Sequence, residues 1–267
     1  MQFINLLIKP TSSMCNLRCR YCFYEDESNN RTNKSFGIMK KEVVNELFKK
    51  TYDAISKNGY INFTFQGGEP TLAGLDYFRN FVSLAKTLKP KDINIQFSIQ
   101  TNGIVINESW AKFFHDEKFL VGLSLDGDEV LHNINRIDSE GKGTYQKVYN
   151  LFKLLRSYNV YVNILSVVTK TLAEQGKKAY ESLKNIGCEY IQFIACLDPK
   201  NKKRGSEPYS LTPKTYGKFL CDVFDIYYDD GKKEIIILFV CLMILFILFC
   251  EREHQLVQHA VYVVDIS

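Results

Sequence analysis

Apolar runs that alternate with helix-like segments dominate residues 3–230. Six runs have the length and composition of strands: Phe3–Ile8, Ile61–Phe65, Ile93–Ile99, Leu120–Leu125, Val160–Val168 and Tyr190–Ala195. Between them, apolar residues recur at helical spacings and predict the helices Lys40–Ser56, Leu75–Leu88, Glu108–His115, Tyr145–Tyr158, Ala173–Ile186 and Thr212–Tyr228. The polar segment Glu25–Lys34 is interpreted as an excursion over the surface. This alternation predicts an α/β fold with a parallel sheet and helices outside it.

Residues with special backbone or side-chain chemistry follow most of the predicted strands. They are Cys15–Cys22, Gly67–Pro70, Thr101–Gly103, Ser124–Gly127 and Cys196–Leu197. Parallel α/β folds bind their ligands at the carboxyl ends of the strands. The sequence therefore predicts that these loops meet around one site.

The first loop carries Cys15, Cys19 and Cys22 in a C-x3-C-x2-C pattern. Three thiolates on one loop can hold three irons of a [4Fe–4S] cluster, which leaves the fourth iron open to another ligand. Three unrelated thiols, or three zinc ligands with a fourth elsewhere, are the alternatives. The position after a first strand and before the aromatic pair Phe23 and Tyr24 favours the cluster.

Composition narrows the function further. The chain has 267 residues, of which 46% are hydrophobic and 24% charged, as expected of a soluble globular protein. The net charge of +4 is too small to indicate a nucleic-acid partner. Met1–Asn5 lacks the basic start of a signal peptide, which predicts a cytoplasmic location. Eight cysteines then indicate metal or redox chemistry and not a disulfide framework.

The cysteine loop, with Tyr21 before its last cysteine, resembles the signature of radical S-adenosylmethionine (SAM) enzymes. The segment Gly67–Pro70, which reads Gly-Gly-Glu-Pro, resembles a second motif of that family. The resemblance implies a partial (β/α)6 barrel whose cofactors are a [4Fe–4S] cluster and SAM. In that family the open iron chelates the amino and carboxylate groups of SAM, and SAM cleavage yields a 5′-deoxyadenosyl radical that abstracts hydrogen from the substrate.

The resemblance also implies which residues contact SAM. The backbone of Gly68 is expected at the amino group, because a glycine lets backbone approach a ligand. Ser124 is expected at the carboxylate or ribose, with a buried serine bonded to backbone as the alternative. Arg136 is expected at the carboxylate, with a solvated arginine as the alternative. Tyr21 and Leu197 are expected near the adenine.

Tyr24, Gln66 and Asn102 are expected at the same mouth, where they are candidate substrate contacts. For each of them, a satisfied local hydrogen bond is the alternative. The four histidines show no metal-ligand spacing with a carboxylate and receive no predicted role.

Over roughly residues 3–230 the chain is similar to the anaerobic sulfatase-maturating enzymes. The stretches that carry this similarity are Ile8–Tyr24, Thr64–Gly74, Gln100–Gly103 and Ser124–Gly127. The resemblance implies oxidation of a Cys or Ser in a sulfatase polypeptide to formylglycine, with an electron donor such as ferredoxin or flavodoxin. The alternatives are another peptide-modifying radical SAM enzyme and a non-catalytic remnant that binds SAM and a cluster.

The similarity ends near residue 230. We therefore predict a radical SAM barrel over 1–230 and an atypical apolar tail over 231–267, in place of the family's cysteine-rich domain with auxiliary clusters. No residue matches the family's general base, since Asp265 has a different context. The uncharged run Ile235–Cys250 would span about 24 Å as a helix, short of the roughly 30 Å membrane core. A tail anchor, a buried helix and an altered reading frame are open, and the last is favoured.

Overall fold

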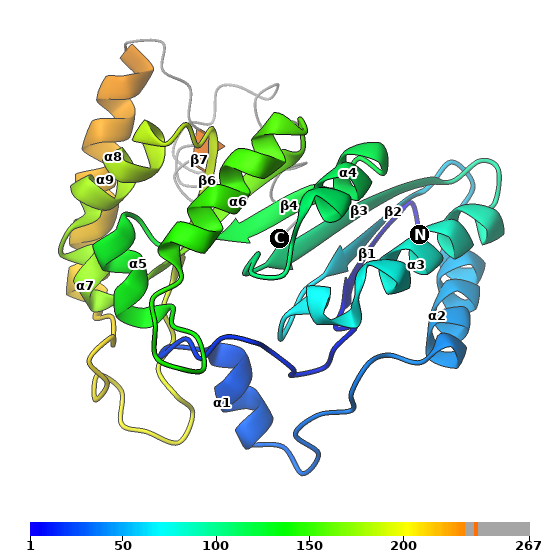
Figure 1. The fold of residues 1–267 in the computed structure, drawn as a ribbon, viewed down its shortest axis with the longest axis horizontal. Coiled ribbons are helices and arrows are strands. Elements are labelled where there is room, and N and C mark those ends of the chain that lie inside the picture. The colour runs from blue at the N-terminus through cyan, green and yellow to red at the C-terminus, as the bar shows by residue number, and fades with distance from the viewer. Residues whose placement is uncertain (233–237, 240–267) are drawn as a thin grey trace.

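The computed structural model describes residues 1–232 and 238–239 (Figure 1). A seven-stranded parallel sheet has the order β1-β2-β3-β4-β5-β6-β7, so each strand pairs with the next one along the chain. The strands are β1 (Phe3–Ile8), β2 (Tyr60–Phe65), β3 (Asn94–Thr101), β4 (Leu120–Ser124), β5 (Tyr161–Val168), β6 (Tyr190–Ala195) and β7 (Leu238–Phe239). The first six confirm the predicted α/β partial barrel.

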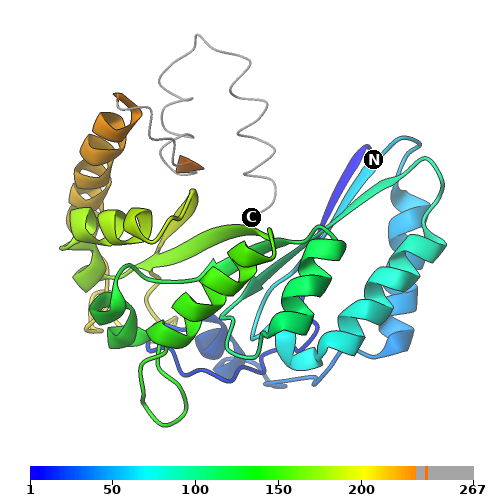
Figure 2. The ribbon, with the colours of Figure 1, turned by 45° about the horizontal axis from the view of Figure 1, so that its top comes forward.

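Helices connect consecutive strands and lie on one side of the curved sheet, as α3, α4 and α6 show most clearly (Figures 1 and 2). The helices are α1 (Phe23–Asn29), α2 (Lys41–Ala54), the 3-10 turn η1 (Pro70–Ala73), α3 (Leu75–Leu88), α4 (Glu108–Asp116), α5 (Glu129–Asn135), α6 (Tyr145–Ser157), α7 (Lys170–Ala173), α8 (Gly176–Asn185) and α9 (Pro213–Lys232). This arrangement leaves the opposite face of the sheet as the inner face of the partial barrel.

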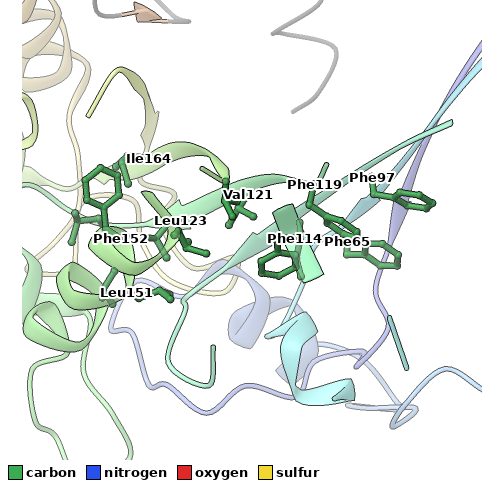
Figure 3. Packing of buried hydrophobic residues seen from close by; sticks show 14 of the residues in the cluster. Phe65, Phe97, Phe114, Phe119, Val121, Leu123, Leu151, Phe152 and Ile164 are labelled. Carbon is green, nitrogen blue, oxygen red and sulfur yellow. The ribbon is translucent and has the colours of Figure 1, made fainter. Parts of the chain in front are cut away.

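The hydrophobic core fills the space between the sheet and these helices. Phe65 on β2 is fully buried, and its ring centre lies 4.9 Å from those of both Phe78 and Phe81 on α3. Figure 3 shows the aromatic packing continuing through Phe97 and Phe119. Aromatic side chains bury large apolar areas, so this layer is a main source of the fold's stability.

The inner face of the sheet is polar, because alternate residues of a strand point to opposite faces. On β2, Asn62 and Thr64 point away from the phenylalanines. The Thr64 hydroxyl lies 2.8 Å from that of Ser98 on β3, and the Asn62 amide donates to Asn5 on β1 at 3.2 Å. Bonds between neighbouring strands satisfy these buried groups.

Two predicted elements were wrong in detail. The first residues of the supposed surface excursion Glu25–Lys34 belong to α1, which begins after Cys22 and carries Glu25 and Asp26 in its first turn. The predicted helix Ala173–Ile186 begins too early: it corresponds to α8, while Ala173 belongs to the short, unpredicted helix α7 that precedes it. The seven-residue helix α5 was not predicted, because it is too short to show a periodic pattern. It begins at a cap, where Asp128 accepts from Leu131 N at 2.9 Å.

The predicted tail falls mostly outside the described residues. Leu238 and Phe239 form β7, which pairs with β6 in the register Tyr190↔Leu238, while Asp265 and the rest of the apolar run lie outside. Within the described ranges, no helix is long and apolar enough to cross a membrane. The domain boundary at residue 230 stays a prediction.

We expect Phe65→Ala to lower the free energy of unfolding by about 3–5 kcal/mol, because it leaves a cavity between β2 and α3. Phe36→Ala is the control, since Phe36 is 74% exposed and its truncation should change that free energy by less than about 0.5 kcal/mol. Urea unfolding of the two variants measures the difference. Equal losses would contradict this description of the core.

Candidate functional site

A cavity of about 330 Å³ lies at the carboxyl ends of the strands. All eleven residues predicted at the site line it: Cys15, Cys19, Tyr21, Cys22, Tyr24, Gln66, Gly68, Asn102, Ser124, Arg136 and Leu197. A larger cavity of about 850 Å³ lies at the opposite ends of the strands and contains none of them. The chemistry predicted from separate loops is therefore gathered in one place.

The cysteine loop between β1 and α1 is tied to the body of the protein on two sides. Glu69 N donates to the Met14 carbonyl at 2.7 Å, which joins the loop to the segment after β2. Arg18 N donates to the Ile137 carbonyl at 2.8 Å, and Arg20 N donates to the Asn135 carbonyl at 3.0 Å. These backbone bonds place the loop between the ends of β2 and α5.

The three thiols lie in a partly buried environment. Burial raises the pKa of Cys15 to about 11 and that of Cys19 to about 12, and it also raises the pKa of Cys22. Two N–H donors point at the Cys15 sulfur: Leu17 N at 3.4 Å and the Asn102 amide at 3.7 Å. Metal binding requires thiolates and displaces their protons, and such donors stabilise a metal-bound sulfur.

Three thiols from one loop line the cavity: Cys15, Cys19 and Cys22. A [4Fe–4S] cube takes one thiolate per iron, so three cysteines fit a cluster that keeps one iron open. Among residues 1–232 and 238–239, no group of three His, Cys, Asp or Glu side chains has the arrangement of a site for one metal ion.

Glu69 is a buried carboxylate that joins the loops after β2 and β3. One oxygen accepts from Thr71 N at 3.1 Å, from the Thr71 hydroxyl at 2.6 Å and from the Thr101 hydroxyl at 2.7 Å. The other oxygen accepts from Asn102 N at 2.7 Å. Burial raises the pKa of Glu69, and these hydrogen bonds oppose the rise. Its linking role was not predicted from the Gly-Gly-Glu-Pro motif.

Gly68 is required by a close backbone approach. Its φ is +60°, and a Cβ there would lie 2.5 Å from the Met14 carbonyl oxygen and 2.9 Å from that of Ser12. Glycine is therefore required here for a second reason besides the predicted contact with SAM: any side chain would collide with the backbone of the cysteine loop.

Ser124 at the end of β4 has a side-chain partner. The Gln100 amide on β3 donates to the Ser124 hydroxyl at 3.1 Å, where the alternative had predicted a bond to backbone. The Gln100 side chain passes over Gly122: a Cβ at residue 122 would lie 2.1 Å from the side-chain oxygen of Gln100. Gln100 was not predicted at the site, although it also lines the cavity.

Arg136 is buried, with 6% of its surface exposed, so the solvated alternative is wrong. Its Nε donates to Asp126 at 2.9 Å and its Nη2 donates to the other carboxylate oxygen at 3.2 Å. The Tyr21 hydroxyl also donates to Asp126. Asp126 was missed because the sequence shows only an acid after a strand, not its partners.

The three candidate substrate contacts differ in their surroundings. Asn102 is 7% exposed, and its amide donates to Asn16 at 2.8 Å as well as to Cys15, so the alternative of a local hydrogen bond describes it. Tyr24 hydrogen-bonds Gln66, and both line the cavity. Contacts with substrate stay predictions for Tyr24, Gln66 and Asn102.

Leu197, the predicted adenine contact, lines the cavity and is 59% exposed at its edge.

His132, which received no predicted role, is buried behind Asp126 and Arg136 and hydrogen-bonds the backbone of Asp126. Its Nδ1 accepts from Asp126 N at 3.3 Å, and its Nε2 lies 3.0 Å from the Thr144 hydroxyl. That hydroxyl donates to the Arg136 carbonyl at 3.0 Å. Burial lowers the pKa of His132 to about 3, so the imidazole is neutral near pH 7.

Comparison with known proteins decides the family. The sequence model of the Radical SAM superfamily matches residues 10–188. The chain belongs to the radical SAM superfamily. Membership implies a [4Fe–4S] cluster and SAM as the cofactors of this radical SAM protein, and the site described above has the donors for both.

Curated relatives of this radical SAM protein include two proteins named cysteine-type anaerobic sulfatase-maturating enzymes. It is 46% identical over 230 residues to one from Clostridium novyi and 48% identical over 227 residues to one from Clostridium perfringens. These matches cover 86% and 85% of this chain. The chain spans 61% of the length of these relatives. A serine-type relative from Klebsiella aerogenes is 34% identical, with 82% of this chain and 53% of the relative covered.

Solved structures agree with the fold of this radical SAM protein. One described as "Native anSMEcpe with bound AdoMet and Kp18Cys peptide" superposes with a TM-score of 0.83 at 44% identity and covers 89% of this chain and 63% of that one. A structure of Streptococcus suis SuiB bound to its precursor peptide SuiA superposes with a TM-score of 0.63 at 20% identity, over 90% of this chain and 49% of that one. The second likeness concerns the fold alone.

We expect Gly68→Ala to reduce the iron bound per chain severalfold, because the new Cβ displaces the backbone of the cysteine loop. Gly74→Ala is the matched control: Gly74 also has a positive φ, at +87°, but a Cβ there meets no atom within 4 Å. Both variants place a side chain at positive φ, which costs about 1–3 kcal/mol, and only the first carries the clash. Iron and sulfide analysis measures the outcome, and equal iron content in the two would contradict it.

We expect the protein to lose stability in acid through His132. A lowered folded pKa means that the stabilisation is complete above the unfolded value of 6.5 and is lost as the pH falls toward about 3. Between pH 7 and pH 5 the loss from this group is about 2 kcal/mol. Urea unfolding of wild type and His132→Gln at both pH values measures it, since the variant lacks the titration. Parallel pH profiles would be the contrary result.

Proposed function

We propose that this chain is the SAM-binding barrel of an anaerobic sulfatase-maturating enzyme, which oxidises a cysteine of a sulfatase polypeptide to formylglycine. The observation that carries the proposal is the single cavity into which all eleven predicted residues come together. The identity of 46–48% to cysteine-type enzymes, against 34% to a serine-type one, supports cysteine as the target.

We assign the cluster to Cys15, Cys19 and Cys22. A cluster with bound SAM supplies a 5′-deoxyadenosyl radical, which takes a hydrogen atom from the substrate. The protein's own contribution is binding, orientation and shielding. The backbone at Gly68 receives the amino group of SAM, and Arg136 receives its carboxylate. Ser124 receives the carboxylate or the ribose, and Tyr21 and Leu197 flank the adenine.

The substrate segment enters at the exposed edge of the cavity. Leu197 at this edge is 59% exposed, and Tyr24 and Gln66 lie on the same lining, where they are the proposed contacts for a peptide. The electron needed for SAM cleavage comes from a small redox protein such as ferredoxin or flavodoxin, in the cytoplasm. A second peptide-modifying activity within the same superfamily is the alternative, and the choice of peptide separates the two.

The test is anaerobic reconstitution followed by reduction with dithionite. Wild type should bind about four irons and four sulfides per chain and should release 5′-deoxyadenosine from SAM. The triple variant C15A/C19A/C22A should do neither. The double variant C188A/C221A is the matched control, because it removes two thiols outside the cavity lining and should retain both properties.

The same samples, incubated with a sulfatase peptide deuterated at Cβ of its target cysteine, should transfer deuterium into 5′-deoxyadenosine, because hydrogen abstraction requires only the barrel, SAM and a bound peptide. Completing the oxidation to the aldehyde, which hydrazine would trap, also requires a base and an acceptor for the second electron, and no residue of this chain matches the family's base. A cluster-loaded wild type that forms no 5′-deoxyadenosine would overturn the proposed radical chemistry. Formation of 5′-deoxyadenosine with a modification other than the aldehyde would favour the alternative activity.

A further inference from the structure

Asp126, directly after β4, joins more of the site than any of the predicted residues. It is 2% exposed, and its carboxylate accepts hydrogen bonds from three directions. Arg136 donates from the end of α5 at 2.9 and 3.2 Å, Val167 N donates from β5 at 2.9 Å, and the Tyr21 hydroxyl donates from the cysteine loop. Asp126 N donates in turn to His132.

We propose that Asp126 is a positioning residue that sets both the orientation of Arg136 toward SAM and the place of the cysteine loop. The inference rests on the proposed function, since it concerns the same SAM site. It goes further because it assigns a residue that contacts neither cofactor in the proposed arrangement, and because it couples the two halves of the site through one side chain.

The first arm of the proposal concerns the guanidinium group. Asp126 engages Nε and Nη2 of Arg136 in a bidentate pair, which leaves Nη1 outside the pair, while Arg136 lines the cavity. A planar guanidinium held on two nitrogens has little rotational freedom, so its third nitrogen has a defined direction. Without the carboxylate, a buried cation would lose its partner and its orientation together.

The second arm concerns the loop that carries the cysteines. Tyr21 stands between Cys19 and Cys22, is 9% exposed, and places its ring centre 5.5 Å from the Arg136 guanidinium carbon. Its bond to Asp126 links the loop's interior to the end of β4, 105 residues along the chain. The backbone bonds from Arg18 and Arg20 to the end of α5 hold the other side of the loop. A displacement of Asp126 or Arg136 would therefore shift Tyr21 and, with it, the cysteines on either side.

The chain offers a matched control for the loss of this carboxylate. Asp230 on α9 is 3% exposed and also joins a cation to a tyrosine: Lys184 donates at 2.8 Å and the Tyr180 hydroxyl donates at 3.1 Å. None of these three residues lines the cavity. Asp126→Asn and Asp230→Asn thus break the same kind of buried network, one at the site and one away from it.

The experiment titrates SAM into the reduced, cluster-loaded protein and follows the change in its electron paramagnetic resonance spectrum. D126N should raise the dissociation constant for SAM about tenfold or more, the loss expected for one charge-assisted hydrogen bond. D230N should leave that constant within about twofold of wild type, even where its melting temperature falls. Equal constants for D126N and wild type would overturn the proposal.

A double variant separates positioning from general damage. If Asp126 acts partly through Arg136, then D126N/R136Q should bind SAM more tightly than the two single losses multiplied together predict, because coupled sites are not additive. Any weakening beyond that of R136Q alone reports the second arm, the contact of Asp126 with the cysteine loop through Tyr21. Losses that multiply would overturn the proposal. Should D126N fail to take up iron, the comparison passes to D126E against D230E, where only D126E should weaken SAM binding; equal constants there would also overturn it.

The outcomes also distinguish this inference from the proposed function. A wild type that takes up no cluster or shows no spectral change with SAM overturns the function and the inference with it. A wild type that responds to SAM together with an unaffected D126N overturns the inference alone.

Discussion

Two buried carboxylates, Glu69 and Asp126, hold the loops of the site in place. A carboxylate removed from water must receive hydrogen bonds or a counter-charge, and these two receive them from neighbouring loops and strand ends. Glu69 takes its donors from Thr71, Thr101 and Asn102, and Asp126 takes its donors from Tyr21, Arg136 and Val167. The need to satisfy two carboxylates therefore fixes the relative positions of five segments that are distant in sequence: Tyr21, Glu69–Thr71, Thr101–Asn102, Asp126–Arg136 and Val167.

The two faces of the sheet differ: the outer face is apolar and stabilises the fold, and the inner face is polar. On the outer face, phenylalanines such as Phe65 pack against the helices and supply the apolar burial. On the inner face, Thr64, Ser98 and Gln100 replace apolar side chains with hydroxyl and amide groups. A fold that stabilises itself on one face can keep the other polar, which suits a barrel that must hold charged cofactor groups.

Glycines permit the closest contacts of this arrangement. Gly68 lets the backbone of the cysteine loop approach the segment after β2, and Gly122 makes room for the Gln100 side chain to reach Ser124. The first also has a positive φ, which few residues other than glycine adopt at low cost. The motif Gly-Gly-Glu-Pro thus combines a close approach with the carboxylate that stabilises it.

The sequence alone determined the parallel α/β fold, the cysteine loop and the expectation that loops after the strands share one site. These features depend on local periodicity and on the direction of parallel strands, both of which can be read from residues near one another. All eleven predicted residues do line one cavity. The tertiary structure decided their partners. Three of these partnerships join different segments of the fold. Arg136 pairs with Asp126, the Asn102 amide donates to the Cys15 sulfur, and the neutral His132 imidazole accepts from Asp126 N. Such contacts, and the pKa shifts that burial causes, exist only after the chain has folded, because local sequence does not specify which donor will face a buried carboxylate.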